Sequence, residues 1–244
     1  MANSSVANSS SEAAKRIAEN LAEVRGRIAR AAEASGRAGE SVTLVAVTKY
    51  GDEEATRTLA EAGCGDLGES RPQALWSKAA ALADLSVRWH MVGHLQRNKI
   101  RRTLPLVSLL HSLDSTRLID DVEKEAGLLS HKAAALLEVN VSGESNKHGF
   151  APAELVHVLP TLATLDWVDV CGLMCMAALD GGADEAARNF ASLRELRDRL
   201  QPECPANVTL KELSMGMSGD FEIAIREGAT IVRIGSALFE GVTV

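Results

Sequence analysis

Apolar and polar positions follow two different periods along this chain. Between residues 13 and 33, apolar side chains recur every three or four positions, which predicts an amphipathic helix with one apolar stripe. The stripe consists of Ile17, Leu21, Val24 and Ile28. Beyond residue 41 the pattern changes to short apolar runs that alternate with helix-like stretches, so that a different architecture begins there.

Eight short apolar runs predict eight β-strands. They span residues 43–49, 66–70, 87–93, 107–114, 134–141, 167–176, 207–216 and 230–236. Helix-like segments begin near Asp52, Arg71, Leu95, Ser115, Ala151, Asp184 and Ser218, and a last short one begins at Ser236. Most runs are continuously apolar, as expected for strands covered on both faces, and their alternation with helices implies parallel pairing.

Eight strand–helix units in 244 residues favour a closed barrel over an open doubly wound sheet. No GxGxxG motif follows a strand. The sequence therefore predicts an α/β fold, a single (β/α)8 TIM-type barrel with an extra N-terminal helix, in one domain over residues 12–244. Residues 1–11 are small and polar and are predicted to form a disordered tail. Because the chain ends just after the last unit, we expect no second domain to reach the barrel mouth.

Composition narrows the class of protein. Hydrophobic residues make up 46% of the chain and aromatic residues only 3%, which predicts an aliphatic core. A net charge of -7 argues against a nucleic-acid partner. The four cysteines have no metal-ligand or disulfide spacing, and no apolar run reaches the length of a membrane span. We expect a cytoplasmic monomer with free thiols, no metal and no membrane partner.

Polar side chains follow the predicted strands where each strand ends. In parallel barrels, catalytic and binding residues gather at these carboxyl ends. Lys49 ends the first strand, and Ser70, His94 and Asn140 end later ones. From position alone, a lysine there is usually a solvated surface charge, so its role depends on what else lies at the same end.

Two loops near the C-terminus predict a phosphate site, in "LSMGMSGDFEIAI" and "VRIGSALFEG". They supply Ser214, Ser218, Gly235 and Ser236, whose hydroxyl and backbone N–H groups suit an anion at helix N-termini. The alternative is that Ser218 and Ser236 only cap the following helices. Arg233 alternates to the inside of the barrel, where it needs a partner; an ion pair with Glu212 is one alternative.

A lysine facing a phosphate site suggests a phosphorylated aldehyde held as a Schiff base. Two kinds of ligand satisfy this description from spacing alone. One is the cofactor pyridoxal phosphate, and the other is a sugar phosphate in an aldolase. A purified protein with bound pyridoxal phosphate absorbs visible light, whereas an aldolase does not.

The chain resembles the pyridoxal phosphate homeostasis proteins of the YggS/PROSC type from about Val42 to Glu240. The motifs that carry the resemblance are "VAVTK", "LGES", "WHMVGHLQRNK", "HSLDS", "EVNVSGESNKHGF", "GLMCMA" and "LSMGMSGDFEIAIREGATIVRIGSALFE". The resemblance implies a barrel similar to the N-terminal domain of alanine racemase. It also implies that Lys49 carries pyridoxal 5'-phosphate as an aldimine, that Ser214, Gly235 and Ser236 hold its phosphate, and that Arg233 faces the pyridine nitrogen.

Four positions differ from the family pattern. Ser70 stands where the family usually has Asn, and Pro72 follows in the same loop. Any contact that the Asn side-chain amide makes near the cofactor ring is therefore shortened or bridged by water in this chain. Tyr50 and Gly51 follow Lys49 where small polar and charged residues are usual, which alters the pocket rim.

Residues near the mouth have competing interpretations. His94 is either a proton shuttle or, more often for such a residue, a structural hydrogen-bonding group. Lys147 and His148 lie in the loop after the fifth strand, and we expect them to be solvated rather than to contact ligand.

Two classes of function compete. In the first, the protein binds pyridoxal phosphate, takes part in intracellular vitamin B6 homeostasis and passes the cofactor to apo-enzymes, with no catalytic residues of its own. In the second it is a racemase-like enzyme. An arginine keeps its proton, so a pyridine nitrogen facing Arg233 stays unprotonated and the ring is a poor electron sink. The first class is therefore the prediction.

Overall fold

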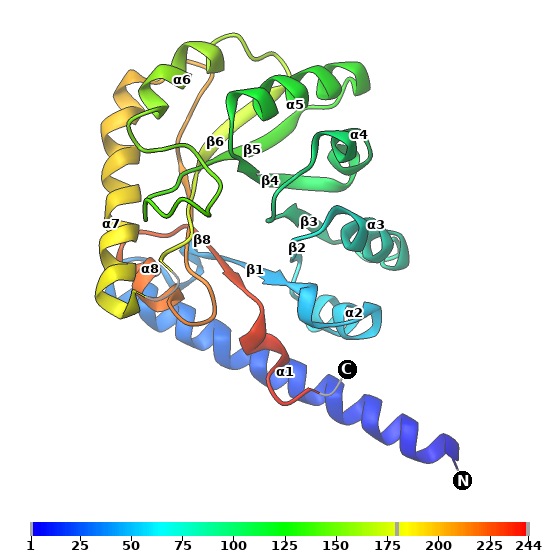
Figure 1. The fold of residues 1–244 in the computed structure, drawn as a ribbon. Helices are drawn as coiled ribbons and strands as arrows, with labels where there is room; N and C mark the ends of the chain where they lie inside the picture. Colours follow the sequence, from blue (N-terminus) through cyan, green and yellow to red (C-terminus); the bar gives the residue numbers. More distant parts are fainter. Residues whose placement is uncertain (1, 179–180, 243–244) are drawn as a thin grey trace.

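The chain folds into a closed barrel of eight parallel strands surrounded by helices (Figure 1). The computed structural model describes residues 2–178 and 181–242. Each strand pairs with its sequence neighbours, in the order β1-β2-β3-β4-β5-β6-β7-β8, and the barrel closes between β1 and β8. At this closure Thr43 lies opposite Ile231, and Val45 lies opposite Arg233. The predicted (β/α)8 barrel is therefore confirmed.

The strands lie within or just at the predicted runs. They are β1 (Thr43–Val47), β2 (Asp66–Glu69), β3 (Arg88–Met91), β4 (Val107–Leu113), β5 (Ala133–Glu138), β6 (Val168–Met174), β7 (Glu212–Ser214) and β8 (Ile231–Ile234). Strand β7 begins later than the predicted run because the backbone donors before it bond locally instead of to a neighbouring strand. The N–H of Leu210 donates to Gln201 Oε1, and the N–H of Lys211 donates to the Thr209 carbonyl oxygen.

The helices follow the strands in the expected alternation. They are α1 (Ala2–Ala34), α2 (Glu53–Glu61), α3 (Pro72–Ala81), α4 (Ile100–Thr103), α5 (Thr116–Leu129), α6 (Leu155–Leu162), α7 (Gly182–Leu200) and α8 (Phe221–Arg226). Short 3-10 turns complete the path: η1 (Gly39–Ser41), η2 (Thr48–Tyr50), η3 (Arg97–Lys99), η4 (Leu104–Leu106), η5 (Gln201–Glu203) and η6 (Ser236–Phe239). The last unit therefore ends in a 3-10 turn where a short helix is predicted.

Helix α1 runs along the outside of the barrel, beneath the first and last units in Figure 1. It begins at Ala2, so residues 2–11 are helical where the sequence predicts a disordered tail. No proline or glycine interrupts the chain before Gly26, which allows one continuous helix. The predicted apolar stripe is buried, and Asn20 Nδ2 donates to the carbonyl oxygens of Leu238 and Glu240. These contacts fasten α1 to the chain after β8.

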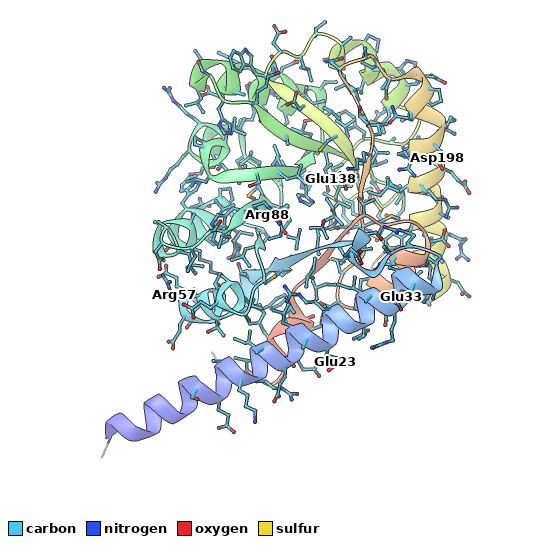
Figure 2. The ribbon with its side chains drawn as sticks, turned by 180° about the vertical axis from the view of Figure 1, so that it is seen from behind. Glu23, Glu33, Arg57, Arg88, Glu138 and Asp198 are labelled. Carbon is cyan, nitrogen blue, oxygen red and sulfur yellow. The ribbon has the colours of Figure 1, made fainter. Side chains whose placement is uncertain are left out.

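Two apolar clusters make up the core. The larger one fills the space between the strands and the surrounding helices. The smaller one lies among the strands and consists of Val45, Leu109, Leu136, Met174 and Ile231. Buried polar groups accompany it, and Figure 2 shows Glu138 amid the strands while Glu23 and Asp198 lie on the outer helices. None of the helices over residues 2–178 and 181–242 is long and apolar enough to cross a bilayer.

Candidate functional site

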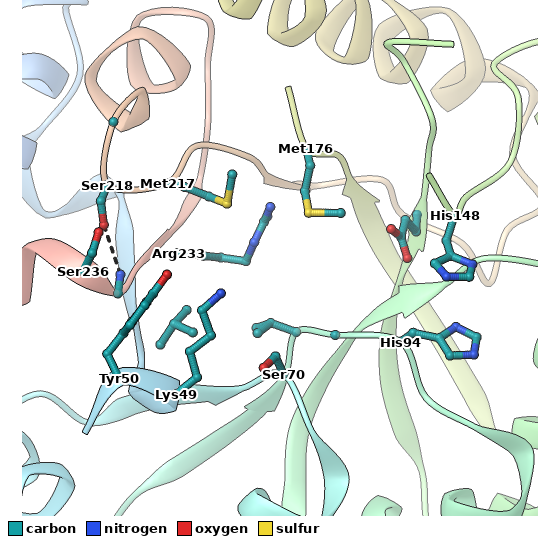
Figure 3. Close-up of a pocket in the computed structure, with 16 residues that line it drawn as sticks. Lys49, Tyr50, Ser70, His94, His148, Met176, Met217, Ser218, Arg233 and Ser236 are labelled. Atoms are coloured by element: carbon teal, nitrogen blue, oxygen red, sulfur yellow. Dashed lines mark hydrogen bonds between the residues drawn. The ribbon is translucent and has the colours of Figure 1, made fainter. Parts of the chain in front are cut away.

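A pocket of about 390 Å³ opens at the carboxyl ends of the strands (Figure 3). Its size is within the range of small-molecule sites. Five of the six residues predicted to bind a cofactor line it: Lys49, Ser218, Arg233, Gly235 and Ser236. Arg233 lies on β8, and the others follow β1, β7 or β8, which are neighbours across the closure of the barrel. Ser214 is the one predicted residue that does not line the pocket.

Lys49 lies on η2, the 3-10 turn that directly follows β1. Its Nζ atom lies 4.9 Å from the centre of the Tyr50 ring, and the two side chains stand side by side in Figure 3. Among the described residues it has no hydrogen-bond or ion-pair partner. The amine therefore faces the pocket without a carboxylate that would compete for it.

A buried ion pair holds the turn that carries Lys49. Lys78 Nζ lies 2.7 Å from Glu69 Oε1 and donates to the carbonyl oxygens of Thr48 at 2.7 Å and Gly51 at 2.8 Å. Thr48 Oγ1 donates to the same Glu69 oxygen at 2.6 Å. Each side of the Lys49 turn is thus tied to one ammonium group.

The role of Lys78 is absent from the sequence predictions. A signal was present, because Lys78 lies on α3 in the apolar stripe formed by Leu75 and Leu82, which are both buried. A lysine in such a stripe is rarely buried without a partner. The pattern alone does not identify that partner, which comes from the end of β2.

Ser218 connects the two predicted phosphate loops. Its Oγ accepts the backbone N–H groups of Gly235 at 3.2 Å and Ala237 at 3.3 Å. The N-cap of α8 is Asp220 and that of η6 is Gly235, and neither helix has a side-chain cap. Ser218 therefore caps the start of η6 from the neighbouring loop, whereas Ser236 caps neither helix.

The backbone lies close to its neighbours in both loops. Gly216 has a φ of 93°, and a Cβ there would approach the Ala224 Cβ to 2.6 Å. A Cβ at Gly235 would lie 2.7 Å from the Tyr50 ring. Glycine is therefore required at both positions, and at Gly235 it lets Tyr50 pack against the loop beside Lys49.

Arg233 points from β8 into the barrel, as predicted, and is 5% exposed. Its Nη1 donates to Ser214 Oγ at 2.7 Å, and its Nη2 donates to the Cys175 carbonyl oxygen at 2.9 Å. Burial lowers the pKa of the guanidinium, but an arginine remains protonated at neutral pH. The alternative of an ion pair with Glu212 is wrong, because Glu212 accepts from Thr230 Oγ1 and has no bond to Arg233.

Ser214 lies behind Arg233 and is fully buried. Its hydroxyl accepts from Arg233 and lies 2.8 Å from His111 Nδ1. With both sides of the hydroxyl occupied inside the barrel, Ser214 does not reach the pocket, and its predicted contact with phosphate disagrees with this placement. The next residue but one, Gly216, begins the loop that does reach the pocket.

A chain of hydrogen bonds continues from Ser214 through the barrel interior. His111 Nε2 lies 3.0 Å from His90 Nδ1, and His90 Nε2 lies 3.0 Å from Asp66 Oδ1. Burial holds the pKa of His111 well below its ordinary value, so this imidazole is neutral. One arrangement gives every bond in this chain a donor and an acceptor: Arg233 donates to Ser214, Ser214 to His111, His111 to His90, and His90 to Asp66. This directional chain fixes the orientation of the guanidinium.

Glu138 is a pocket residue that the sequence analysis missed. It ends β5, is 5% exposed and lines the pocket. Burial and the nearby Asp114 carboxylate raise its pKa to about 7, although Arg233 and His94 oppose the shift. Glu138 lies two positions after Leu136 on β5, so both side chains point to the same face of the strand, inside the barrel. This spacing is the signal in the sequence.

The other mouth residues differ in their surroundings. Lys147 is held by an ion pair with Glu144 and by the Ala177 carbonyl oxygen, so the expectation of a solvated lysine is wrong. His148 is 63% exposed, in agreement with its predicted solvation. His94 Nδ1 lies 2.8 Å from Asp114 Oδ2, which agrees with a hydrogen-bonding role. Ser70 lines the pocket, and its effect on ligand contacts stays a prediction.

The fold and pocket define a class of protein: a single parallel barrel with an unpaired lysine after β1 and small-residue loops after β7 and β8. Residues 15–242 match the family model for the alanine racemase N-terminal domain. A pyridoxal phosphate homeostasis protein from Aquifex aeolicus is 42% identical over 91% of this chain and 96% of its own length. One from Pseudomonas aeruginosa is 40% identical over 91% and 94%.

A solved structure is also similar to this chain. The structure of PipY from Synechococcus elongatus with pyridoxal phosphate bound has a TM-score of 0.81 and 36% identity, and the match covers 91% of this chain and 99% of PipY. The chain belongs to the alanine racemase N-terminal domain family and, within it, to the family of pyridoxal phosphate homeostasis proteins. The resemblance in the sequence motifs is thereby confirmed.

Proposed function

We propose that this protein binds pyridoxal 5'-phosphate covalently through Lys49 and serves vitamin B6 homeostasis as a carrier rather than as a strong catalyst. One observation carries the proposal: an amine free of hydrogen bonds and ion pairs to the described residues faces a pocket that also holds Arg233 and the two small-residue loops. The names of the curated relatives and the pyridoxal phosphate in the PipY structure support it.

The described residues fit the aldehyde, the phosphate and the pyridine nitrogen of this cofactor. Bound pyridoxal phosphate supplies an aldehyde that condenses with an amine, and an electron-accepting ring. Lys49 offers the amine. The Ser218 and Ser236 hydroxyls line the pocket and offer donors for a phosphate, and Arg233 offers a donor for the pyridine nitrogen.

Arg233 also supports the carrier function over catalysis. Because the guanidinium cannot release its proton, it holds an unprotonated pyridine nitrogen and leaves the ring a poor electron sink. The hydrogen-bonded chain behind it, from Ser214 to Asp66, keeps the guanidinium in place. The only tyrosine in the sequence, Tyr50, stands beside Lys49 instead of opposite it. No tyrosine is therefore positioned as an opposing base.

A racemase-like enzyme is the second candidate, and Glu138 is the observation that favours it. A pocket carboxyl with a pKa of about 7 has the acidity of an effective general base at neutral pH. Glu138 ends β5, whereas Lys49 lies on η2 after β1. Glu138→Gln removes this base while keeping the size of the side chain.

Exchange of the amino-acid Cα proton separates the two candidates. The protein loaded with pyridoxal phosphate is incubated with L- and D-alanine in deuterated water, and Cα exchange is followed by NMR. We expect exchange far below typical enzyme turnovers of about 1 to 1,000 per second. Exchange at such rates that is lost in both Lys49→Ala and Glu138→Gln would replace the carrier function with a racemase.

The two serines at the base of the loops are expected to act on different parts of the ligand. Ser236→Ala should weaken binding of pyridoxal phosphate by about 1 to 3 kcal/mol, the range for hydrogen bonds to charged acceptors, and leave phosphate-free pyridoxal nearly unchanged. Ser214→Ala should weaken both ligands equally, because Ser214 contacts Arg233 and not the pocket. Equal losses for Ser236→Ala with both ligands would exclude a phosphate contact there.

The proposed function also concerns the oligomeric state of the protein and the enzymes that receive the cofactor. We infer that the protein acts as a monomer and hands pyridoxal phosphate to apo-enzymes. Light scattering of the purified protein measures its mass, and a dimer would contradict the first inference. Mixing the loaded protein with an apo-aminotransferase should restore aminotransferase activity faster than dilution of the loaded protein releases free cofactor; equal rates would contradict direct transfer.

A further inference from the structure

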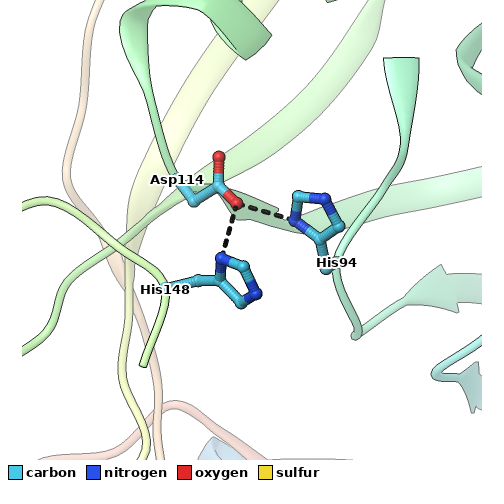
Figure 4. Close-up of side chains that lie close together, drawn as sticks. All are labelled: His94, Asp114 and His148. Carbon is cyan, nitrogen blue, oxygen red and sulfur yellow. Dashed lines mark hydrogen bonds and ion pairs between the residues drawn. The ribbon is translucent and has the colours of Figure 1, made fainter. Parts of the chain in front are cut away.

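Three potential metal ligands meet at the rim of the pocket (Figure 4). His94 follows β3, Asp114 follows β4 and His148 lies in the loop after β5, so three neighbouring strand ends each contribute one side chain. Asp114 Oδ2 lies 2.8 Å from His94 Nδ1 and 3.8 Å from His148 Nδ1. All three ligand atoms lie within 4.8 Å of one another.

The carboxylate is fixed, whereas the imidazoles are accessible. The Asp114 side chain is 8% exposed, and its second oxygen, Oδ1, accepts from Ser115 Oγ at 2.9 Å. The His94 and His148 side chains are 44% and 63% exposed, and their rings stack with centroids 4.6 Å apart and planes 16° apart. Outer hydrogen bonds of this kind orient the carboxylates that bind metals.

Hydrogen bonds alone do not join the three side chains. His94 Nδ1 lies within hydrogen-bond distance of Asp114 Oδ2, whereas His148 Nδ1, at 3.8 Å, lies beyond it. One divalent cation between the three atoms would be bound by both imidazoles and by the carboxylate.

We propose that His94, Asp114 and His148 bind one divalent transition-metal ion at the mouth of the pocket. Two imidazole nitrogens and one carboxylate oxygen suit Zn²⁺, Cu²⁺ or Ni²⁺, whereas Mg²⁺ and Ca²⁺ prefer all-oxygen sites. Ligand atoms around a tetrahedral zinc lie roughly 3.3 Å apart, so modest rotations of the exposed imidazoles complete the site. Three protein ligands leave a coordination position open to water or a small ligand.

No sequence motif indicates this site, and the prediction was that the protein binds no metal. The three residues are separated by 20 and 34 positions, unlike the short spacings that mark metal motifs. Only the barrel brings their strand ends together. Because His94 and His148 also line the pocket, a bound ion would lie at the entrance used by the cofactor.

Titration of the full-length protein with Zn²⁺, followed by calorimetry, tests the proposal. We expect one ion per chain. His94→Ala and His148→Ala should each weaken binding by at least about 10-fold, the lower end of the effect of altering a metal-site residue. His157→Ala is the matched control, because it removes an exposed histidine on α6 outside the cluster.

Two further measurements make the result decisive. Electron paramagnetic resonance with Cu²⁺ should show coupling to two nitrogens, reduced to one in either histidine variant. Lys49→Ala protein should bind Zn²⁺ with unchanged affinity, so failure of the cofactor proposal leaves this one testable. The proposal is overturned if Zn²⁺ does not bind, if either cluster variant binds as tightly as the unaltered protein, or if His157→Ala has the same effect. Circular dichroism checks that each variant is folded.

Discussion

Lys49→Ala is expected to abolish the visible absorbance of protein mixed with pyridoxal phosphate. The amine it removes belongs to the only lysine among the described residues that line the pocket at the strand ends. The fold should survive, because Lys49 is exposed on η2 at the barrel top and supports no packed layer. Absorbance spectra after gel filtration, with circular dichroism for the fold, measure both effects.

The matched control is Lys132→Ala. Lys132 is exposed, precedes β5 at the opposite end of a strand and pairs only loosely with Asp169, at 3.6 Å. It should retain the full absorbance band. A band of normal intensity in Lys49→Ala would show that another lysine holds the cofactor. Absence of any band in the unaltered protein, together with cleavage of a sugar phosphate, would instead support the aldolase alternative.

Lys78→Met is expected to destabilise the fold by about 3 to 5 kcal/mol, the cost of leaving one member of a buried ion pair without its partner. The Glu69 side chain is 1% exposed and the Lys78 side chain 9%, so water screens neither charge well. The substitution also removes donors to Thr48 and Gly51 on both sides of Lys49. Urea unfolding should show lower stability, and pyridoxal phosphate affinity should fall as the Lys49 turn loses its support.

The double variant Glu69→Gln with Lys78→Met is the control for this pair. It removes both charges, so no unpaired buried carboxylate remains and much of the stability should return. Cofactor affinity should stay low, because the donors to Thr48 and Gly51 are still missing. A loss below about 1 kcal/mol in the single variant, typical of exposed ion pairs, would contradict a buried and essential pair.

Sequence reasoning predicted the features that depend on local pattern. Continuous apolar runs located all eight strands, and the rule that strand carboxyl ends carry function placed Lys49, Ser236 and Gly235 at one pocket. The alternation of side chains along β8 correctly turned Arg233 inward. These predictions need only the order of residues within a strand and the direction in which parallel strands run.

The features that sequence reasoning missed depend on contacts across the barrel. Ser214 and Arg233 lie on neighbouring strands, and their register makes the serine a partner of the guanidinium instead of a phosphate ligand. Lys78 meets Glu69 only after α3 packs on β2. The His94, Asp114 and His148 cluster requires three strand ends to converge. Residues 2–11 are part of α1 and contain neither proline nor glycine.

Mapping the lysine that holds pyridoxal phosphate tests covalent binding through Lys49. The protein is loaded with pyridoxal phosphate, reduced with borohydride to make the lysine linkage permanent, digested and mapped by mass spectrometry. We expect one pyridoxyl group per chain, on the peptide that contains Lys49 and on no other. A stable adduct on a different lysine, or no adduct after reduction of a saturated sample, would contradict it.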